Sequence, residues 1–146
     1  KFKTMIQKTD LRTGNHLKYY VGEEGVAWDA TKIDWQDIKW CEEKNENFNQ
    51  VHKGIDITTT ILVMSGFTED NNGSFWYNLQ THYLEIIVGA DGFYPIYAQL
   101  PELSSEAEQR VGLQRVRFIH ELENLFFVLT GQEWNVNLET VGSHDR

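Results

Sequence analysis

The chain has 146 residues, of which 40% are hydrophobic and 24% are charged, and its formal net charge is −9 at pH 7. These values are typical of a globular protein and exclude an intrinsically disordered one, so we expect a single domain over residues 1–146. A surface of this sign repels nucleic-acid phosphate, which argues against direct binding of DNA or RNA.

Cysteine content and hydropathy exclude two further classes. Cys41 is the only cysteine, so neither an internal disulfide nor a cysteine-based zinc site can form within one chain. No run of about 18 apolar residues occurs, and residues 1–10 lack the apolar core of a secretory signal. We therefore expect a cytoplasmic protein that makes no contact with a membrane.

The first elements predict a β-hairpin. Residues 10–21 place a Thr-Gly-Asn turn before a strand-like segment, and the Gly-Glu-Glu-Gly sequence at 22–25 predicts a tight turn into a second strand. Two alternatives, a helix and a strand, are open for the secondary structure of residues 34–43. Asp34 and Asp37 are spaced as at the start of a short helix, while the aromatic residues between 35 and 40 would also suit a strand. The polar composition of residues 42–50 predicts a loop.

The sequence of the middle of the chain predicts a short helix followed by an antiparallel meander. Residues 56–67 begin with a polar cap, Asp56 or Thr58, and end at Gly66, where a left-handed residue is expected. Turn sequences then separate three apolar, aromatic segments typical of neighbouring strands. These segments are residues 74–79, 82–88 and 93–100.

A long helix is expected from Ser104 or Ser105 to Thr130, with Gly112 interrupting or splitting it and Gly131 ending it. Its apolar residues recur at steps of three and four and line one face. They are Val116, Ile119, Leu122, Leu125, Phe126 and Leu129.

The final turns of this helix are apolar almost all round, because Phe127 and Val128 lie off the apolar stripe. Such an end packs on more than one side, against a sheet, a second subunit or the C-terminal segment. A homodimer is therefore among the expectations. Residues 134–139 could add a last edge strand.

Together these elements predict an α+β fold. We expect a curved antiparallel sheet, made of an N-terminal barrel-like hairpin unit and the meander, with one long C-terminal helix packed on it.

The chemistry of the last helix centres on His120. His120-Glu121 is how a zinc-protease helix begins, but the second histidine that must follow four residues later is replaced by Asn124. Asn124 instead lies among hydrophobic residues, where an amide must be hydrogen-bonded. We expect it to hold the helix to the N-terminal hairpin near Gly14 and Asn15, with ligand recognition as the alternative.

The segment around Arg12 has two interpretations. Arg12 and Asn15 could donate hydrogen bonds to an anionic ligand. Alternatively, Arg12 pairs with an acidic residue while Gly14 and Asn15 adopt left-handed turn geometry, which we favour. The remaining histidines show no metal-ligand spacing, and no glycine-rich phosphate loop occurs, so no metal and no cofactor is expected.

Three segments occur in the order and spacing of a known family. Residues 10–15 (DLRTGN), 55–67 (IDITTTILVMSGF) and 116–134 (VRFIHELENLFFVLTGQEW) resemble a family of short uncharacterised proteins of Bacteroidetes genomes, prophages and mobile elements. The chain departs from that pattern at Ile57, where leucine is usual, and by an insertion-like stretch at 90–112. The resemblance implies a phage-like or mobile-element origin and brings no activity with it.

Without a catalytic constellation, the sequence favours a non-enzymatic accessory factor that binds another protein. Its contact would use aromatic residues of the meander, Trp76, Tyr77 or Tyr94, flanked by acids. One alternative is an acidic DNA mimic or toxin-immunity protein that presents acids to a basic nuclease. Those acids lie between residues 23 and 46 and include Asp29, Asp34 and Asp37. A second alternative is a small-molecule-binding domain or hydrolase, which requires an apolar pocket with converging polar groups.

Overall fold

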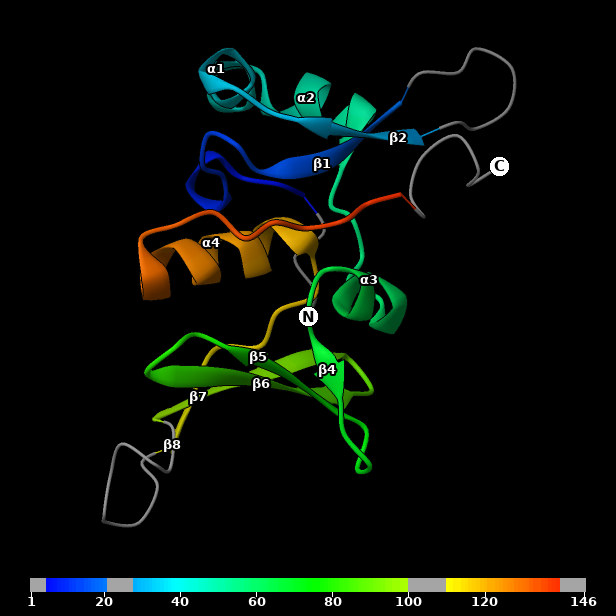
Figure 1. Ribbon diagram of the computed structural model, residues 1–146. Coiled ribbons are helices and arrows are strands. Elements are labelled where there is room, and N and C mark those ends of the chain that lie inside the picture. The colour runs from blue at the N-terminus through cyan, green and yellow to red at the C-terminus, as the bar shows by residue number, and fades with distance from the viewer. Residues whose placement is uncertain (1–4, 21–27, 100–109, 140–146) are drawn as a thin grey trace. The chain divides into compact units, whose positions relative to one another are not determined.

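The computed structural model describes residues 5–20, 28–99 and 110–139, and confirms the α+β class (Figure 1). The chain divides into two compact units, which are described separately. Unit 1 contains Lys1–Asp56, Phe118–Trp134 and Leu138–Arg146, and unit 2 contains Ile57–Arg117 and Asn135–Asn137. That the whole chain acts as a single domain stays a prediction.

Unit 1 is built on a three-stranded antiparallel sheet of order β2-β1-β3. The expected hairpin is confirmed by β1 (His16–Tyr20) and β2 (Trp28–Lys32), and β3 (His52–Lys53) pairs with the other edge of β1. The turn expected at 22–25 lies outside the described residues. The sheet is open in the part of the chain that is described, so the barrel-like closure expected from the sequence is not formed there.

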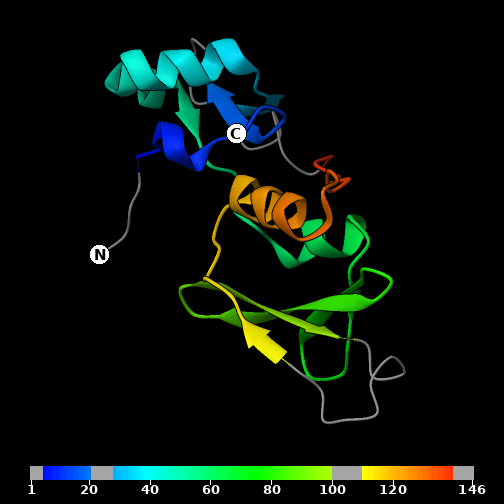
Figure 2. The same ribbon diagram turned by 90° about the vertical axis from the view of Figure 1, so that its left-hand side faces the viewer.

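Helices cover both sides of this sheet (Figures 1 and 2). Helices α1 (Trp35–Glu43) and α2 (Asn45–Val51) lie on one side, and α4 (Ile119–Thr130) lies on the other, where it contacts β1. Leu17 of β1 packs with Ile33 and Phe48 in the core on the α1 and α2 side. Because side chains alternate along a strand, the neighbouring His16 faces the opposite side, toward α4.

The helix alternative for residues 34–43 is confirmed, and its start follows from two carboxylates. Asp34 Oδ1 accepts the backbone N–H groups of Gln36 and Asp37 at 2.9 and 3.1 Å, and Asp37 Oδ2 accepts the N–H of Asp34 at 3.0 Å. This reciprocal pair satisfies donors that the first turn of a helix leaves unbonded.

The prediction of a loop at residues 42–50 is wrong, because α2 occupies most of this segment. The side-chain amides of Asn45 and Asn49 donate to the carbonyl oxygen of Ile6 at 2.8 and 3.0 Å, and Phe48 is buried. These tertiary contacts hold a polar segment helical although its own residues are weak helix formers.

His52 ends α2 in an aromatic cluster. Its ring stacks on Phe48 with 3.9 Å between centroids and meets Trp40 edge-on at 5.4 Å, and Nδ1 donates to the carbonyl oxygen of Phe48 at 2.9 Å. Burial lowers the pKa of His52 below its ordinary value of 6.5.

This buried histidine makes the stability of the protein depend on pH. The unfolded chain takes up the His52 proton at higher pH than the folded chain, so stability is complete above pH 6.5 and falls as the pH drops below it. We expect the free energy of unfolding to fall more between about pH 8 and about pH 5 in the wild type than in His52→Gln. Urea denaturation at each pH measures this. An equal fall in both proteins would contradict it.

The last helix starts later than expected. Residues Arg110–Gly112 form strand β8, so the predicted helix is wrong at these positions. Its expected start at Ser104 or Ser105 lies outside the described residues. Backbone pairing holds the chain extended up to the helix: Phe118 bridges Asp56, and the Ile119 N–H donates to the carbonyl oxygen of Ile55 at 2.8 Å. Glu121 then accepts the N–H of Phe118 at 2.9 Å.

Gly131 ends α4 as expected, with the left-handed φ of 73° that glycine adopts without strain. Beyond it Trp134 is buried, its ring stacked on Phe126 with 5.2 Å between centroids. No strand forms between Trp134 and Glu139, so the edge strand expected there is wrong.

Unit 2 is a five-stranded antiparallel sheet of order β4-β5-β6-β7-β8, which confirms the meander. The strands are β4 (Thr68–Glu69), β5 (Ser74–Asn78), β6 (His82–Gly89), β7 (Gly92–Gln99) and β8 (Arg110–Gly112). Helix α3 (Thr59–Met64) lies over one face of it (Figure 2). As expected, Thr58 caps α3 by accepting the Ile61 N–H at 3.1 Å, and Gly66 follows with a φ of 105°.

The strand register gives this sheet two distinct faces. Phe75, Ile86 and Pro95 pair across three strands and are buried on the face that α3 covers. Trp76, Glu85 and Ile96 pair across the same strands one residue along, and therefore point to the opposite face. Among the described helices none is long and apolar enough to cross a membrane.

Candidate functional site

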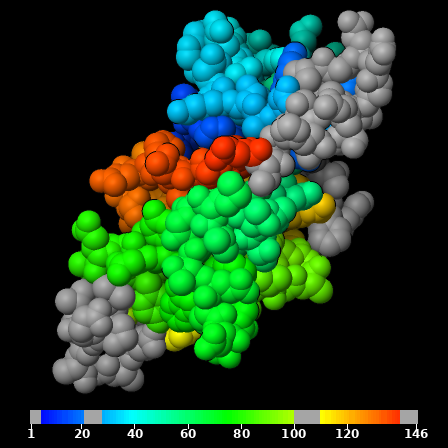
Figure 3. All heavy atoms as spheres, turned by 45° about the vertical axis from the view of Figure 1, so that its right-hand side comes forward, coloured from blue at the N-terminus to red at the C-terminus, as the bar shows by residue number. Residues whose placement is uncertain are grey.

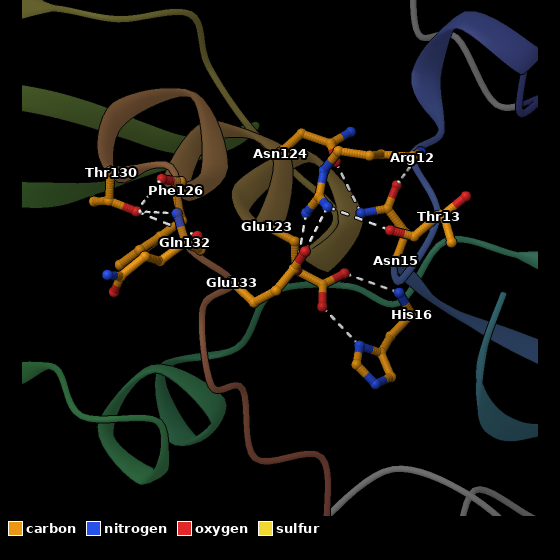
Figure 4. A network of polar contacts seen from close by, with 10 residues as sticks. All are labelled: Arg12, Thr13, Asn15, His16, Glu123, Asn124, Phe126, Thr130, Gln132 and Glu133. Carbon is orange, nitrogen blue, oxygen red and sulfur yellow. Dashed lines mark hydrogen bonds and ion pairs between the residues drawn. The ribbon is translucent and has the colours of Figure 1, made fainter. Parts of the chain in front are cut away.

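A network of polar side chains joins the segment before β1 to α4 and to the residues after it (Figure 4). It contains two of the expected polar residues, Asn15 and Asn124, in direct contact. Asn15 is fully buried, and its Nδ2 donates to Asn124 Oδ1 at 2.8 Å, while Asn124 Nδ2 donates to the carbonyl oxygen of Asp10 at 2.9 Å. The expected attachment of the helix to the N-terminal segment is confirmed.

Left-handed geometry was expected at both Gly14 and Asn15, and the structure has it at Gly14 alone of the two. Gly14 has the left-handed φ of 98°, and its N–H donates to the carbonyl oxygen of Ile33 at 3.0 Å. Asn15 does not share this geometry, since Gln80 is the one residue other than glycine with positive φ in the described ranges. Its side chain instead closes the turn, because Oδ1 accepts the backbone N–H of Arg12 at 2.6 Å.

Glu123 and His16 form the buried centre of the network, and sequence reasoning did not place them there. Glu123 Oε1 accepts the backbone N–H of His16 at 2.8 Å, and Oε2 accepts the N–H of its ring Nδ1 at 2.6 Å. Glu123 is buried, whereas the His16 side chain is three-quarters buried. A glutamate next to Asn124 inside an apolar helix was the available signal, because a buried carboxylate requires a partner.

Arg12 pairs with an acid, as favoured from the sequence. Its Nη1 and Nη2 donate to the two carboxylate oxygens of Glu133 at 2.6 and 3.0 Å, and its guanidinium lies 4.2 Å from the centroid of the Phe127 ring. The hydrogen bonds from Arg12 lower the pKa of Glu133 and in turn raise that of Arg12. Such a two-point pair fixes the plane of the guanidinium as well as its position.

His120, the fourth residue of the expected polar cluster, is buried elsewhere on α4. Its ring stacks on Phe118 with 5.7 Å between centroids. Within the described ranges, no group of three or more His, Cys, Asp or Glu residues is placed to hold a metal ion.

The network is suited to holding structure. Each carboxylate oxygen of Glu123 and of Glu133 accepts a hydrogen bond from the N-terminal segment. The buried carboxylate of Glu123 adds little net stability compared with an apolar contact, but losing one partner of its contact leaves the other desolvated and unpaired. We infer that the network fixes how α4 meets β1.

The expected aromatic surface is divided between the two faces of the meander. Tyr77 belongs to the face under α3, where its ring lies 5.0 Å from that of Phe67. Trp76 and Tyr94 share the opposite face, because adjacent residues of a strand point in opposite directions. Trp76 Nε1 donates to Asp70 Oδ2 at 2.7 Å, and the Tyr94 hydroxyl donates to Asp91 Oδ1 at 2.7 Å.

The expected acidic surface is also divided. Asp34 and Asp37 bond the first turn of α1, whereas Asp29 lies on β2 opposite Tyr19. Two of the three acids therefore have a local structural role.

A small open cavity of about 240 Å³ lies beside Cys41, lined by Gln7, Lys8, Thr9, Cys41, Glu42 and Asn45. Burial raises the pKa of the Cys41 thiol, which disfavours the reactive thiolate. Polar and apolar atoms both line the cavity, and its residues other than Cys41 are polar or charged in type.

No protein-family model, curated protein or solved structure matches the chain.

The two glutamates of the network are expected to differ in their contribution to stability. Glu123→Ala leaves the His16 donors unpaired in the interior and is expected to lower the free energy of unfolding by about 3 kcal/mol. Glu133→Ala removes a pair that is half exposed and is expected to cost less than about 1 kcal/mol. Urea denaturation of the two variants measures both values. Equal losses would contradict a buried centre at Glu123.

Proposed function

We propose that this protein is a non-enzymatic accessory factor that binds another protein through the face of its meander opposite α3. This meander face is defined by the residues that point away from α3. They are Trp76, Tyr83, Glu85, Ile87, Tyr94 and Ile96.

The observation that carries the proposal is that two carboxylates hold the aromatic residues of this face. Asp70 accepts the indole N–H of Trp76, and the Trp76 ring also packs on Tyr83 with 4.7 Å between centroids. Asp91 accepts the hydroxyl of Tyr94 and is itself bound by Arg115 at 2.9 Å. The hydrogen bonds from Trp76 and Tyr94 lower the pKa values of Asp70 and Asp91, so both are ionised at neutral pH.

Aromatic rings that are already held lose little conformational freedom when a partner covers them. Tryptophan and tyrosine are also the residues that most often dominate binding energy at protein interfaces. Tyr94 and Ile87 are paired neighbours on β6 and β7, and both are exposed at the surface. A partner would cover this apolar pair. The ionised Asp70 favours a partner with basic groups, whereas Asp91 is already paired with Arg115.

A place among phage-like or mobile-element proteins rests on the resemblance of residues 10–15, 55–67 and 116–134 alone. This origin is part of the proposal because a non-enzymatic accessory protein of a phage-like or mobile element would act by binding another protein of that element. A cytoplasmic location belongs to the same proposal.

Affinity capture from a lysate of the native host, with mass spectrometry of the retained proteins, tests this proposal. We expect the wild type to retain one specific partner. Tyr94→Ala should retain at least about tenfold less of that partner. Trp35→Ala is the matched control, because Trp35 is 63% exposed on α1 and lies outside the meander face. Thermal denaturation of both variants checks that they are folded.

The salt dependence of capture separates the alternatives. A partner retained at high salt supports an aromatic interface. A basic nuclease lost at high salt, and unaffected by Tyr94→Ala, would contradict the meander face and support an acidic DNA mimic or toxin-immunity protein. A partner lost equally from the Trp35 and Tyr94 variants would also contradict it.

A further inference from the structure

We propose that the C-terminal end of α4 is a self-association surface whose occupant is a second copy of this chain. Helix α4 buries Ile119, Leu122 and Phe126, but its last turns leave Phe127 38% exposed and Val128 79% exposed. Figure 3 shows this end of the helix, in orange, at the surface of the molecule. Val128 is the most exposed large hydrophobic residue in the described chain.

Phe127 is held in place by the polar network. The guanidinium of Arg12 lies over its ring at 4.2 Å, and Glu133 fixes that guanidinium through two hydrogen bonds. The surface made of Arg12, Phe127, Val128 and Glu133 is called the α4 patch, and the contacts among Arg12, Phe127 and Glu133 order this part of it before any partner binds. An ordered apolar surface flanked by a fixed arginine is the kind of residue set that contributes most at protein interfaces.

Charge decides which occupant suits the α4 patch. The whole chain carries −9, so two copies repel each other and a basic partner is drawn to the acidic surface elsewhere. In the α4 patch the charges of Arg12 and Glu133 cancel, and Lys32 lies close enough to Glu133 to lower its pKa further. A neutral apolar patch does not attract a basic partner electrostatically. On a strongly acidic chain, it is also the place where the electrostatic repulsion between two copies is weakest.

The size of the α4 patch sets the strength of this contact. A stable protein interface buries about 800 Å² on each partner, which two exposed apolar side chains do not provide. We therefore expect a weak dimer, with Kd between about 10 µM and about 1 mM.

Salt dependence distinguishes this dimer from an ionic complex. Added salt screens the repulsion between two chains of like charge and leaves the apolar contact in place. The dimer should therefore tighten as salt rises, whereas binding of a basic partner weakens.

Sedimentation equilibrium of the full chain tests the proposal, over a concentration series at about 0.05 M and about 0.5 M NaCl. We expect a monomer–dimer equilibrium with lower Kd at the higher salt. Val128→Glu places a charge in the α4 patch and should raise Kd at least about tenfold. Val63→Glu is the matched control, since Val63 is a helical valine that is 49% exposed on α3, and it should leave Kd unchanged.

Three results would overturn the proposal. These are a monomer mass at every concentration up to about 1 mM, a dimer that weakens with salt, and equal effects of the two valine variants. Both valines are exposed, so both variants are expected to fold, which circular dichroism checks. The inference does not depend on the proposed function, because the α4 patch belongs to unit 1 and the meander face to unit 2.

Discussion

The hydrogen bonds from His16 to both carboxylate oxygens of Glu123 constrain the rest of unit 1. A buried carboxylate is tolerated only where donors meet it, so α4 must present Glu123 to this one position of β1. Side chains alternate along β1, so with His16 facing α4, Leu17 faces the core under α1 and α2. A slip of one residue would exchange the two and place Leu17 against the carboxylate, which fixes the register of the strand.

Acidic side chains recur as groups that hold neighbouring structure. Asp34 caps α1, Glu133 holds Arg12, and Glu85 accepts from Arg110 at 2.6 Å on the meander face. Asp70 and Asp91 fix two aromatic rings in the same way. Many of the acids behind the net charge of −9 are thus committed to local contacts. This use of carboxylates supports partner binding through ordered aromatic and apolar surfaces more than through a continuous acidic one.

Local signals predicted the elements whose ends are set by their own residues. Thr58 with Gly66, and Gly131, mark helix boundaries that the structure has, because caps act within one turn. Asp34 and Asp37 indicated a helix start that the sequence left as one of two alternatives, and the structure has that helix. Helix α2 and the late start of α4 were missed, since each depends on residues distant in sequence, such as Ile6 and Asp56. The Asn15–Asn124 contact was predictable because a buried amide needs a partner. The same reasoning applied to Glu123 would have shown that it needs a donor, but the structure is what identifies that donor as His16. Strand alternation, which the sequence already contains, separates Tyr77 from Trp76 and Tyr94 among the aromatic residues named for a partner contact.

Native-state hydrogen exchange at the backbone amide of His16 tests most directly whether Glu123 is the buried centre of unit 1. The account predicts that the free energy of the opening that exposes this amide to exchange is nearly that of global unfolding. The reason is that the acceptor of the amide is an interior carboxylate. In Glu123→Gln the protection should fall while that of strand amides bonded to backbone persists. Exchange of the wild-type amide at the rate of an exposed one would contradict the account, because α4 and β1 would then not be joined through Glu123.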